Sequence, residues 1–485
     1  MKKSALLLLC ALLIPMAVAC SSGSGDTAAD ASSAETTTAE TTAEVTTEEK
    51  VTDDLPALDF KGYEFKVSTR YAPIYFNHTL DTPEETGDVV NDAIFQRNRK
   101  VEERLNIVFT EICYDNATQG QDVPRTLMLA GDTTYDMFVA RGLKAFTWAT
   151  EGLLDEFTNL KYIDLEKPYW DHSINDALVI GGHMYFAVGA FNLTTYEWTH
   201  VLTFNKDMFD DFNLDDPYAM VKDGTWDYDE FISMAKTAPA DLDGNGVFDA
   251  NDRYGFESLP SEVLPSFWMS AELLTIEKDN DGYLVYKLPG NAKFLEVYTK
   301  VLNTMWSDNV YYNMPLTVTN EEQYKLFTNN QALFCNANFF KISKLRAMET
   351  DFGILPYPKW EESQDEYISR IEGCEMPVLP LANTDYERTG AILECLASES
   401  PDTVVEAYYD VALTGKYARD TESVEMLDII SSNRVYDYGD TILTNHVRNN
   451  LLRTQFMANN TDIVSHLTSS EPTINAELKK LNGQK

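Results

Sequence analysis

The sequence has few basic residues for its length. Its 485 residues include 38 Lys and Arg against 78 Asp and Glu, which gives a formal net charge of −40 at pH 7. Nucleic-acid binding requires clustered Lys and Arg at the phosphates, so this class of function is excluded. Electrostatic docking on an anionic membrane is disfavoured for the same reason. An acidic surface suits a neutral or cationic ligand, and in the simplest interpretation it only keeps the protein soluble.

Histidine and cysteine are also scarce, with six of each. No H-E-x-x-H, G-x-S-x-G or P-loop motif occurs, so zincins, α/β-hydrolases and P-loop NTPases have no support. No C-x-x-C pair occurs either, so a zinc or redox site is unsupported. One disulfide is conceivable in a secreted protein, but the spacing does not select a pair. By default we expect buried free thiols beyond residue 20. These are Cys113, Cys335, Cys374 and Cys395.

Long apolar runs are absent apart from one near the N-terminus. Two lysines precede an apolar run over residues 5–19, which is too short for a comfortable membrane span and is typical of a secretory signal. The run ends in Ala-Val-Ala-Cys, which resembles a bacterial lipobox with Cys20 as the acylated first mature residue, although Ala17 stands where that pattern prefers Leu. We therefore expect a signal peptide over 1–19 and a lipid anchor at Cys20. Ordinary signal cleavage with a free cysteine is the alternative.

The segment that follows the cysteine has almost no apolar residues. From 21 to 54 it consists mainly of Ser, Thr, Ala, Glu and Asp, without an aromatic residue. Such a segment buries too little apolar area to offset the entropy of ordering, and its like charges extend it. We expect residues 20–56 to form a disordered tether above the membrane, and no transmembrane helix in the mature chain.

Strand and helix signals alternate in the rest of the chain. Residues 63–67, 107–112 and 136–140 have the alternating or β-branched apolar residues of strands. Apolar residues recur at helical spacing over 90–105, and a further helix is expected to end at 127–130. Repeated strand–helix–strand units predict mainly parallel sheets flanked by helices, an α/β fold.

The C-terminal third changes character. Helical spacing of apolar residues recurs over 384–397, 403–413 and 424–432, separated by short polar or Gly breaks. This pattern predicts a helical C-terminal region rather than another sheet.

Six segments, in order, resemble the family 1 extracellular solute-binding proteins, and the resemblance covers about residues 60 to 430. The segments are AGDTTYD (130–136), EGLLDEF (151–157), GGHMYF (181–186), FNKDMF (204–209), TWDYDEF (225–231) and FGILPYPK (352–359). Each segment is a weak signal alone, and their order makes the set specific. The lipoprotein-like N-terminus supports the same interpretation independently.

The resemblance implies a two-lobed periplasmic-binding-protein-like fold of type II, in which each lobe is built from discontinuous chain. We expect one lobe over 57–168 and 320–372, and the other over 169–319 and 373–485. It further implies a monomeric ABC-importer lipoprotein on the extracellular face of a bacterial membrane. Such a protein captures an oligosaccharide between its lobes and passes it to permease subunits.

The most specific chemical motif is an EF-hand-like loop over 241–252. Oxygen donors occupy loop positions 1, 3, 5, 9 and 12, position 7 offers a backbone carbonyl, and Gly246 stands at position 6, where the chain must turn. This spacing suits bound Ca²⁺ with a structural role, and a metal-free turn held by Asx hydrogen bonds is the alternative. We expect a helix before the loop and a strand after it. The candidate ligands are Asp241, Asp243, Asn245, Val247 through its carbonyl, Asp249 and Asp252.

Ligands of open parallel sheets bind beyond the carboxyl ends of the strands. Aromatic side chains suit the apolar faces of sugar rings, and Asp, Asn and Arg suit the hydroxyl groups. The candidates chosen by this rule, or near an expected crossing between lobes, are Arg70, Tyr71, Arg141, Trp170, Asp171, Asn192, Trp268, Asn336 and Asn338. Each Trp is a core residue about as often as a ligand contact.

Three other functions remain as alternatives. A peptide- or polyamine-binding protein belongs to the same binding class. A secreted glycosidase needs only two carboxylates roughly 5–10 Å apart, which no sequence pattern excludes. An adhesion lipoprotein is the third. We expect a binding protein rather than an enzyme.

Overall fold

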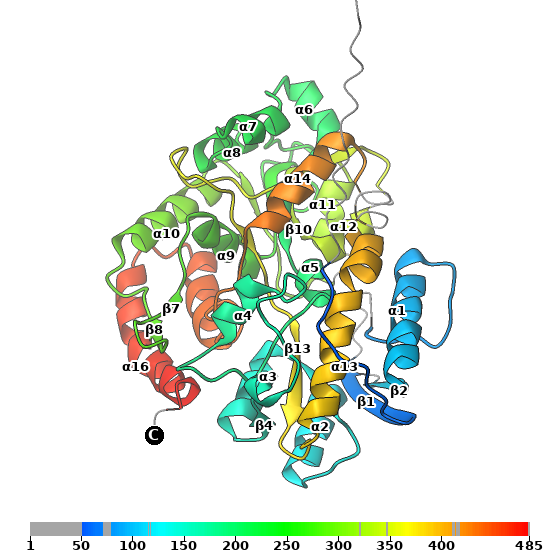
Figure 1. Ribbon diagram of the computed structural model, residues 1–485. Helices are drawn as coiled ribbons and strands as arrows, with labels where there is room; N and C mark the ends of the chain where they lie inside the picture. Colours follow the sequence, from blue (N-terminus) through cyan, green and yellow to red (C-terminus); the bar gives the residue numbers. More distant parts are fainter. Residues whose placement is uncertain are drawn as a thin grey trace, which may run out of the picture. The chain divides into compact units, whose positions relative to one another are not determined.

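The computed structural model describes residues 51–70, 79–114, 116, 118–319, 322–345, 348–409, 413 and 418–483. The expected signal peptide, the anchor at Cys20 and most of the tether lie outside these residues. Val51–Lys485 forms one compact unit that contains two five-stranded sheets (Figure 1).

The tether ends earlier than the sequence predicted. Residues 51–56 were expected to be disordered, but Asp53 is 9% exposed and pairs with Arg104 at 2.6 Å. Its carboxylate also accepts a hydrogen bond from Ser398 Oγ at 2.5 Å. These contacts with α1 and α13 offset the entropy of ordering that composition alone predicted to prevail.

The first sheet has the order β2-β1-β3-β13-β4. Its strands are β1 (Tyr63–Arg70), β2 (Ile107–Tyr114), β3 (Met137–Arg141), β4 (Leu154–Asp155) and β13 (Glu375–Pro380). β1 is parallel to both β2 and β3, and β13 runs antiparallel between β3 and β4.

The second sheet has the order β11-β5-β10-β6-β9. Its strands are β5 (His200–Asn205), β6 (Tyr254–Ser258), β9 (Tyr311–Asn313), β10 (Ala332–Asn338) and β11 (Phe352–Leu355). Only β5 is antiparallel to its neighbours. Two short ribbons complete the strands, namely β7 (Ile276–Lys278) with β8 (Leu284–Tyr286), and β12 (Ser369–Arg370) with β14 (Arg434–Val435).

These sheets confirm the predicted α/β fold class, but they correct the assignment of three strands. We expected 320–372 to join the first sheet and 373–485 the second. Instead β10 and β11 pair with β5, and β13 pairs with β3. The chain therefore crosses to the second sheet before β5 and returns between β11 and β13. The strand that enters the second sheet, β5, and the strand that returns to the first, β13, each run antiparallel to their neighbours. Local sequence patterns do not indicate the direction of a strand in its sheet.

Helices cover both sheets (Figure 1). The helices up to the loop region are α1 (Val89–Leu105), α2 (Gln119–Leu129), α3 (Gly142–Thr150), α4 (His172–Leu178), α5 (Thr194–Glu197), α6 (Lys206–Phe212), α7 (Pro217–Asp223) and α8 (Tyr228–Ala235), with the 3₁₀ turn η1 (Phe157–Asn159). Those that follow are α9 (Pro260–Ser270), α10 (Ala292–Met305), η2 (Glu322–Tyr324), α11 (Lys325–Thr328) and α12 (Phe339–Leu345).

The helical C-terminal region is present as expected. It consists of α13 (Tyr386–Glu399), η3 (Pro401–Val405), α14 (Thr421–Ser432), η5 (Asn445–Arg453), α15 (Thr454–Met457) and α16 (Ile463–Leu481), where η3 and η5 are π-helical. These helices do not form one cap. α13 packs on α1 beside the first sheet, α14 packs on β11 of the second, and η5 packs on α9 (Figure 1).

Local signals explain where the helices begin. The Asp88 side chain caps α1 by accepting from the amides of Val90 and Asn91, and Asp227 caps α8 by accepting from Glu230. Trp226, beside that cap, is fully buried and donates its indole N–H to Pro356 at 3.1 Å. It is therefore a core anchor of the second sheet.

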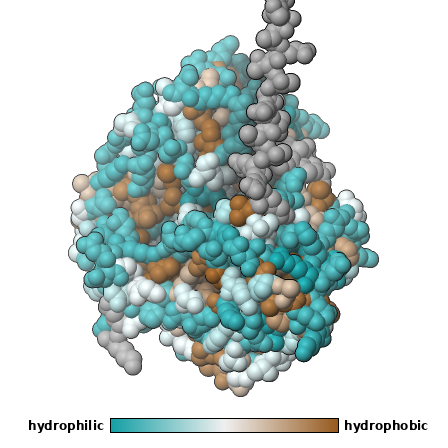
Figure 2. Space-filling model, viewed as in Figure 1, coloured by the Kyte–Doolittle hydropathy of each residue, from teal (hydrophilic) through white to brown (hydrophobic). Residues whose placement is uncertain are grey.

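The surface is mainly hydrophilic, and most of the described cysteines are buried. Hydrophilic side chains predominate on the face shown in Figure 2, and the hydrophobic ones form small groups. Within the described ranges no helix has the length and apolarity needed to cross a bilayer. The four described cysteines are free, and Cys335, Cys374 and Cys395 are buried as expected, whereas Cys113 is exposed.

Candidate ligand-binding site

A cavity of about 660 Å³ is lined by residues that follow strands of both sheets. Arg70 and Arg141 are the last residues of β1 and β3 in the first sheet, and Asn338 is the last residue of β10 in the second. Parallel strands bring their carboxyl ends to one edge, where their backbone groups are no longer paired and a ligand finds room. The cavity is of the size that holds small ligands.

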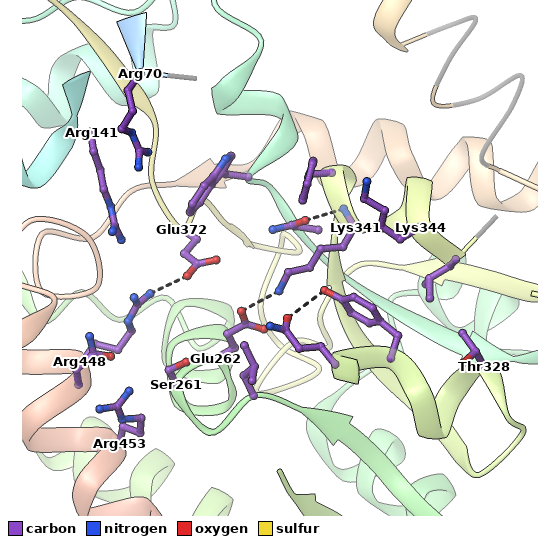
Figure 3. Close-up of a pocket in the computed structure, with 18 residues that line it drawn as sticks. Arg70, Arg141, Ser261, Glu262, Thr328, Lys341, Lys344, Glu372, Arg448 and Arg453 are labelled. Carbon is purple, nitrogen blue, oxygen red and sulfur yellow. Dashed lines mark hydrogen bonds and ion pairs between the residues drawn. The ribbon is translucent and has the colours of Figure 1, made fainter. Parts of the chain in front are cut away.

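Helices that directly follow the strands supply further lining residues. α9 follows β6 and contributes Ser261 and Glu262, and α12 follows β10 and contributes Lys341 and Lys344. The remaining charged residues come from elsewhere in the chain. They are Glu372, on the segment that returns to β13, and Arg448 and Arg453 on η5 (Figure 3).

The two lining carboxylates are held by cationic partners. Lys341 Nζ donates to Glu262 Oε1 at 2.9 Å, and Arg448 Nη1 donates to Glu372 Oε1 at 3.1 Å (Figure 3). Burial alone would lower the pKa of Lys341, but the charge of Glu262 raises it above its ordinary value. Lys341 is therefore protonated at neutral pH, and the four side chains of the two pairs are each at most 14% exposed.

A buried network of charged residues surrounds Glu372 on the side away from the cavity. Arg370, 1% exposed, donates from Nε to Asp440 at 2.7 Å, and Arg448 donates to the same carboxylate at 3.1 Å. His200 Nε2 lies 3.2 Å from Glu372 Oε2. Burial alone would raise the pKa of Glu372, but this hydrogen bond and the two guanidinium charges hold it well below its usual range. Burial and the charge of Arg370 lower the pKa of His200, so the imidazole is neutral at pH 7.

His200, Glu262 and Glu372 each offer a donor atom within 4.8 Å of the others, the spacing of a metal site. However, Arg370 Nη1 lies 3.0 Å from His200 Nε2, and Lys341 and Arg448 already occupy the two carboxylates. These positive charges repel a divalent cation. The cluster therefore orients the cavity wall rather than binding a metal.

Aromatic and amide side chains complete the cavity. Trp198, Tyr324 and Phe340 are each below 9% exposed and line it together with Asn338 and Gln323. Rings of this kind pack against the apolar faces of sugars, and amides hydrogen-bond hydroxyl groups. The lining thus combines stacking surfaces, hydrogen-bonding groups and a high density of charge.

The structure brings three of the sequence-predicted residues together in this cavity, namely Arg70, Arg141 and Asn338. Asn336 lies just behind it, because its amide donates to Glu262 and its carbonyl accepts from Tyr357 at 2.5 Å. Tyr71 lies outside the described residues.

The other four candidates do not line the cavity. Trp170 and Asp171 line a separate cavity of about 290 Å³, where Trp170 donates to Glu394 at 3.1 Å and Asp171 pairs with Arg434 at 2.7 Å. Trp268 is 1% exposed in the core of α9. Asn192 is buried and donates to the backbone carbonyl of Glu375.

Sequence reasoning missed most of the charged lining. Lys341 and Lys344 lie within the first two turns after β10, so extending the strand-end rule into the following helix would have found them. Arg448 and Arg453 carry no such signal, because η5 follows no strand of either sheet. The same extension from β6 into α9 would have found Glu262, whereas Glu372, on the segment before β13, carries no such signal.

The EF-hand-like loop forms a second candidate site. Asp241, Asp243 and Asp252 offer carboxylate oxygens within 4.8 Å of one another. Asp252 is fully buried and accepts from the amides of Leu242 at 2.9 Å and Asp249 at 2.8 Å. The loop lies between α8 and β6, so the expected preceding helix and following strand are confirmed.

The loop backbone also has the geometry that the motif requires. Gly246, at position 6, has φ of 79°, which only glycine adopts without strain. Its amide donates to Asp241 at 2.8 Å, and this hydrogen bond is the main reason that the pKa of Asp241 lies below its ordinary value. Three converging carboxylates at a tight turn fit a hard cation such as Ca²⁺.

Comparisons with known proteins give the fold a context. No family model matches the sequence, and a search of curated proteins also found no match. A sugar transporter from Rhizobium etli in an open conformation matches with a TM-score of 0.58 and 14% identity, over 86% of this chain and 100% of that one. The cyclic α-maltosyl-1,6-maltose binding protein of Arthrobacter globiformis matches with a TM-score of 0.57 and 13% identity, over 87% and 100%.

A third structure is an ABC substrate-binding protein from Listeria monocytogenes in complex with cycloalternan, with a TM-score of 0.52 and 13% identity over 87% and 100% of the two chains. At such low identity the likeness concerns the fold alone. It agrees with the fold class that the six sequence segments implied. The chain has the type II fold of ABC solute-binding proteins, with a cavity lined from both of its sheets.

Proposed function

We propose that this protein is an extracellular solute-binding lipoprotein of an ABC importer and that it captures an oligosaccharide. The observation that carries this proposal is the cavity of about 660 Å³ at the carboxyl ends of β1, β3 and β10, with Trp198, Tyr324 and Phe340 in its lining. Support comes from the fold shared with proteins described as sugar binders and from the secretory and lipobox-like N-terminus. A monomer tethered at Cys20 would deliver the sugar to permease subunits.

Binding without chemical change is part of the same proposal. A glycosidase requires one carboxylic acid that stays protonated near neutral pH. Glu372 is the reverse of this, because its partners hold its pKa well below the usual range. Glu262 is held by Lys341 and Asn336. Neither carboxylate is arranged to give up a proton to a glycosidic oxygen.

The peptide and polyamine alternatives differ in how they fit the cavity. A polyamine is a cation, and the six Lys and Arg residues of the lining repel it. A peptide is not excluded by charge, so it must be tested directly.

A thermal-shift screen of the purified soluble body tests the function. Oligosaccharides, mixed short peptides and polyamines are added separately, and the melting temperature is measured. We expect an oligosaccharide to raise it, because a ligand at a hundred times its Kd stabilises the folded state by about 2.7 kcal/mol. The sugar should be recovered unchanged after prolonged incubation. Stabilisation by peptides or polyamines alone, or hydrolysis of the sugar, would refute the proposal.

We further propose that the loop over 241–252 binds Ca²⁺ in a structural role. The converging carboxylates of Asp241, Asp243 and Asp252 support this, together with the turn at Gly246. Asn245, Asp249 and the carbonyl of Val247 are the remaining ligands expected from the motif. The bound ion would fix the connection between α8 and β6, on the second sheet.

A further inference from the structure

The charge of the cavity is opposite to that of the whole chain. Of its 18 lining residues, six are Lys or Arg and two are Glu (Figure 3). In the sequence as a whole, acidic residues outnumber basic ones by 78 to 38. Cations that line a recess with walls of low dielectric constant produce a concentrated positive potential inside it. This potential is opposite in sign to that of the acidic protein surface. The six are Arg70, Arg141, Lys341, Lys344, Arg448 and Arg453.

Half of these cations already have a carboxylate partner. The two glutamates that line the cavity are both used in this way, so they cancel no further charge. The pairs are Arg70 with Glu375, Lys341 with Glu262, and Arg448 with Glu372.

The side chains of Arg141, Lys344 and Arg453 have no such partner. None of the three forms an ion pair or a hydrogen bond with any residue that the structure describes. Arg141 and Arg453 are half-buried, and Lys344 lies at the exposed rim. Partial burial and the neighbouring charge of Arg448 lower the pKa of Arg453, as expected where positive charge accumulates. Elsewhere in the protein a buried guanidinium such as Arg370 is fully paired.

The cations stand on opposite sides of the cavity. Figure 3 shows Arg141 and Arg453 on the side of Arg448, whereas Lys341 and Lys344 lie on the other side, on α12. Because the glutamates lie between the two groups of cations, the arrangement matches a ligand that carries more than one anionic group. The guanidinium group is planar and binds a carboxylate or a sulfate through two hydrogen bonds.

We propose, resting on the sugar-binding function above, that the ligand is an acidic oligosaccharide. Its rings would pack on Trp198, Tyr324 and Phe340, and its carboxylate or sulfate groups would pair with Arg141, Arg453 and Lys344. This reverses the expectation of a neutral or cationic ligand that net charge suggested. The acidic surface does not prevent capture, because at physiological salt it is screened beyond about 8 Å.

Matched ligands separate charge from sugar shape. Binding is measured by isothermal titration calorimetry with uronate oligosaccharides of two to four residues, and with the same oligosaccharides after reduction of their carboxyl groups to alcohols. Sulfated disaccharides and their desulfated forms make a second series, which distinguishes carboxylate from sulfate. Neutral malto- and xylo-oligosaccharides complete the set. We expect one acidic series to bind at least about tenfold more tightly than its neutral counterpart, since a charge-assisted hydrogen bond exceeds a neutral one in strength.

Variants locate the charge effect in the cavity. Arg141→Gln and Arg453→Gln should each weaken binding of the acidic ligand about tenfold or more, and Lys344→Gln should weaken it less because that side chain is at the rim. None of them should weaken binding of the neutral counterpart to the same extent. Lys479→Gln, an exposed lysine of α16 outside the cavity, is the matched control and should bind like the parent. Unchanged melting temperatures verify that the variants are folded.

The outcomes distinguish the two proposals. If neutral oligosaccharides bind as tightly as acidic ones, or if the Arg variants bind the acidic ligand like the parent, the inference about charge is wrong and the sugar-binding function stands. If no oligosaccharide of either kind binds while a peptide does, both proposals are wrong.

Discussion

At the scale of residues, position alone does not decide what a side chain does. Arg70 and Arg141 both end a strand of the first sheet and both line the cavity. Arg70 is 3% exposed and pairs with Glu375 on β13, whereas no described carboxylate pairs with Arg141. The difference arises because β13 returns to the sheet beside β3 and places a carboxylate toward one arginine only. One arginine therefore braces the sheet, and the other remains available to a ligand.

A buried carboxyl group just after β14 makes the free energy of unfolding depend on pH. Asp437 is fully buried, and burial raises its pKa from 3.8 to about 7. Its Oδ1 accepts from the amides of Thr275 at 3.2 Å and Gly439 at 3.3 Å. Since the folded-state pKa is above the unfolded value, the stabilising contribution is complete below pH 4 and is lost as the pH rises through 7.

Asp437→Asn should therefore flatten the pH dependence. The amide keeps the shape and the Oδ1 acceptor but never ionises, so the variant should gain on the parent between pH 5 and pH 8, by roughly 2 °C or more in melting temperature. Differential scanning fluorimetry across this pH range measures the gain. Asp215→Asn, at an exposed position, is the control. A constant difference between variant and parent at all pH values would contradict a raised pKa at Asp437.

At the scale of elements, the local spacing of apolar residues predicted helices and strands well. α1, with its buried face of Val90, Ile94, Val101 and Leu105, follows the predicted apolar period. The loop over 241–252 is likewise set by its own residues, because most of its side-chain hydrogen bonds return to its own backbone. If this loop binds an ion, we expect it to respond to that ion independently of any ligand in the cavity.

The calcium proposal gives a prediction for this element. Adding Ca²⁺ should raise the melting temperature and EDTA should lower it, since an ion that binds only the folded state stabilises it by mass action. Asp241→Asn together with Asp243→Asn should abolish the response, because two of the three converging carboxylates lose their charge. Asp215→Asn again serves as the control and should respond like the parent. A melting curve that neither Ca²⁺ nor EDTA moves would exclude a structural ion.

At the scale of the whole molecule, the chain supplies strands to the first sheet in two separate stretches and to the second sheet in one. It builds β1 to β4, crosses to the second sheet, and returns as β13 between β3 and β4. Both crossings bring cavity residues with them, Trp198 just before β5 and Glu372 just before β13. The same segments thus connect the two sheets and line the cavity.

Attachment to the membrane is also a property of the whole chain. If Cys20 is the acylated residue, Cys20→Ser should move the protein from the membrane fraction to the culture medium. Loss of the acyl chains removes the apolar surface that holds the protein in the bilayer. Cys113→Ser, at an exposed cysteine of the body, should leave the protein in the membrane fraction. Fractionation followed by immunoblotting measures both, and an unchanged distribution of Cys20→Ser would rule out this anchor.

The sequence by itself determined what depends on neighbouring residues. The strand and helix periods, the turn at Gly246 and the α/β fold class all follow from local spacing. The tertiary structure alone decided which sheet β10, β11 and β13 join, and it gathered Arg141, Lys344 and Arg453 into one cavity. It also placed Trp170 and Trp268 elsewhere. The physical reason is that strand pairing and charge pairing join residues hundreds of positions apart, and no local pattern records such partners.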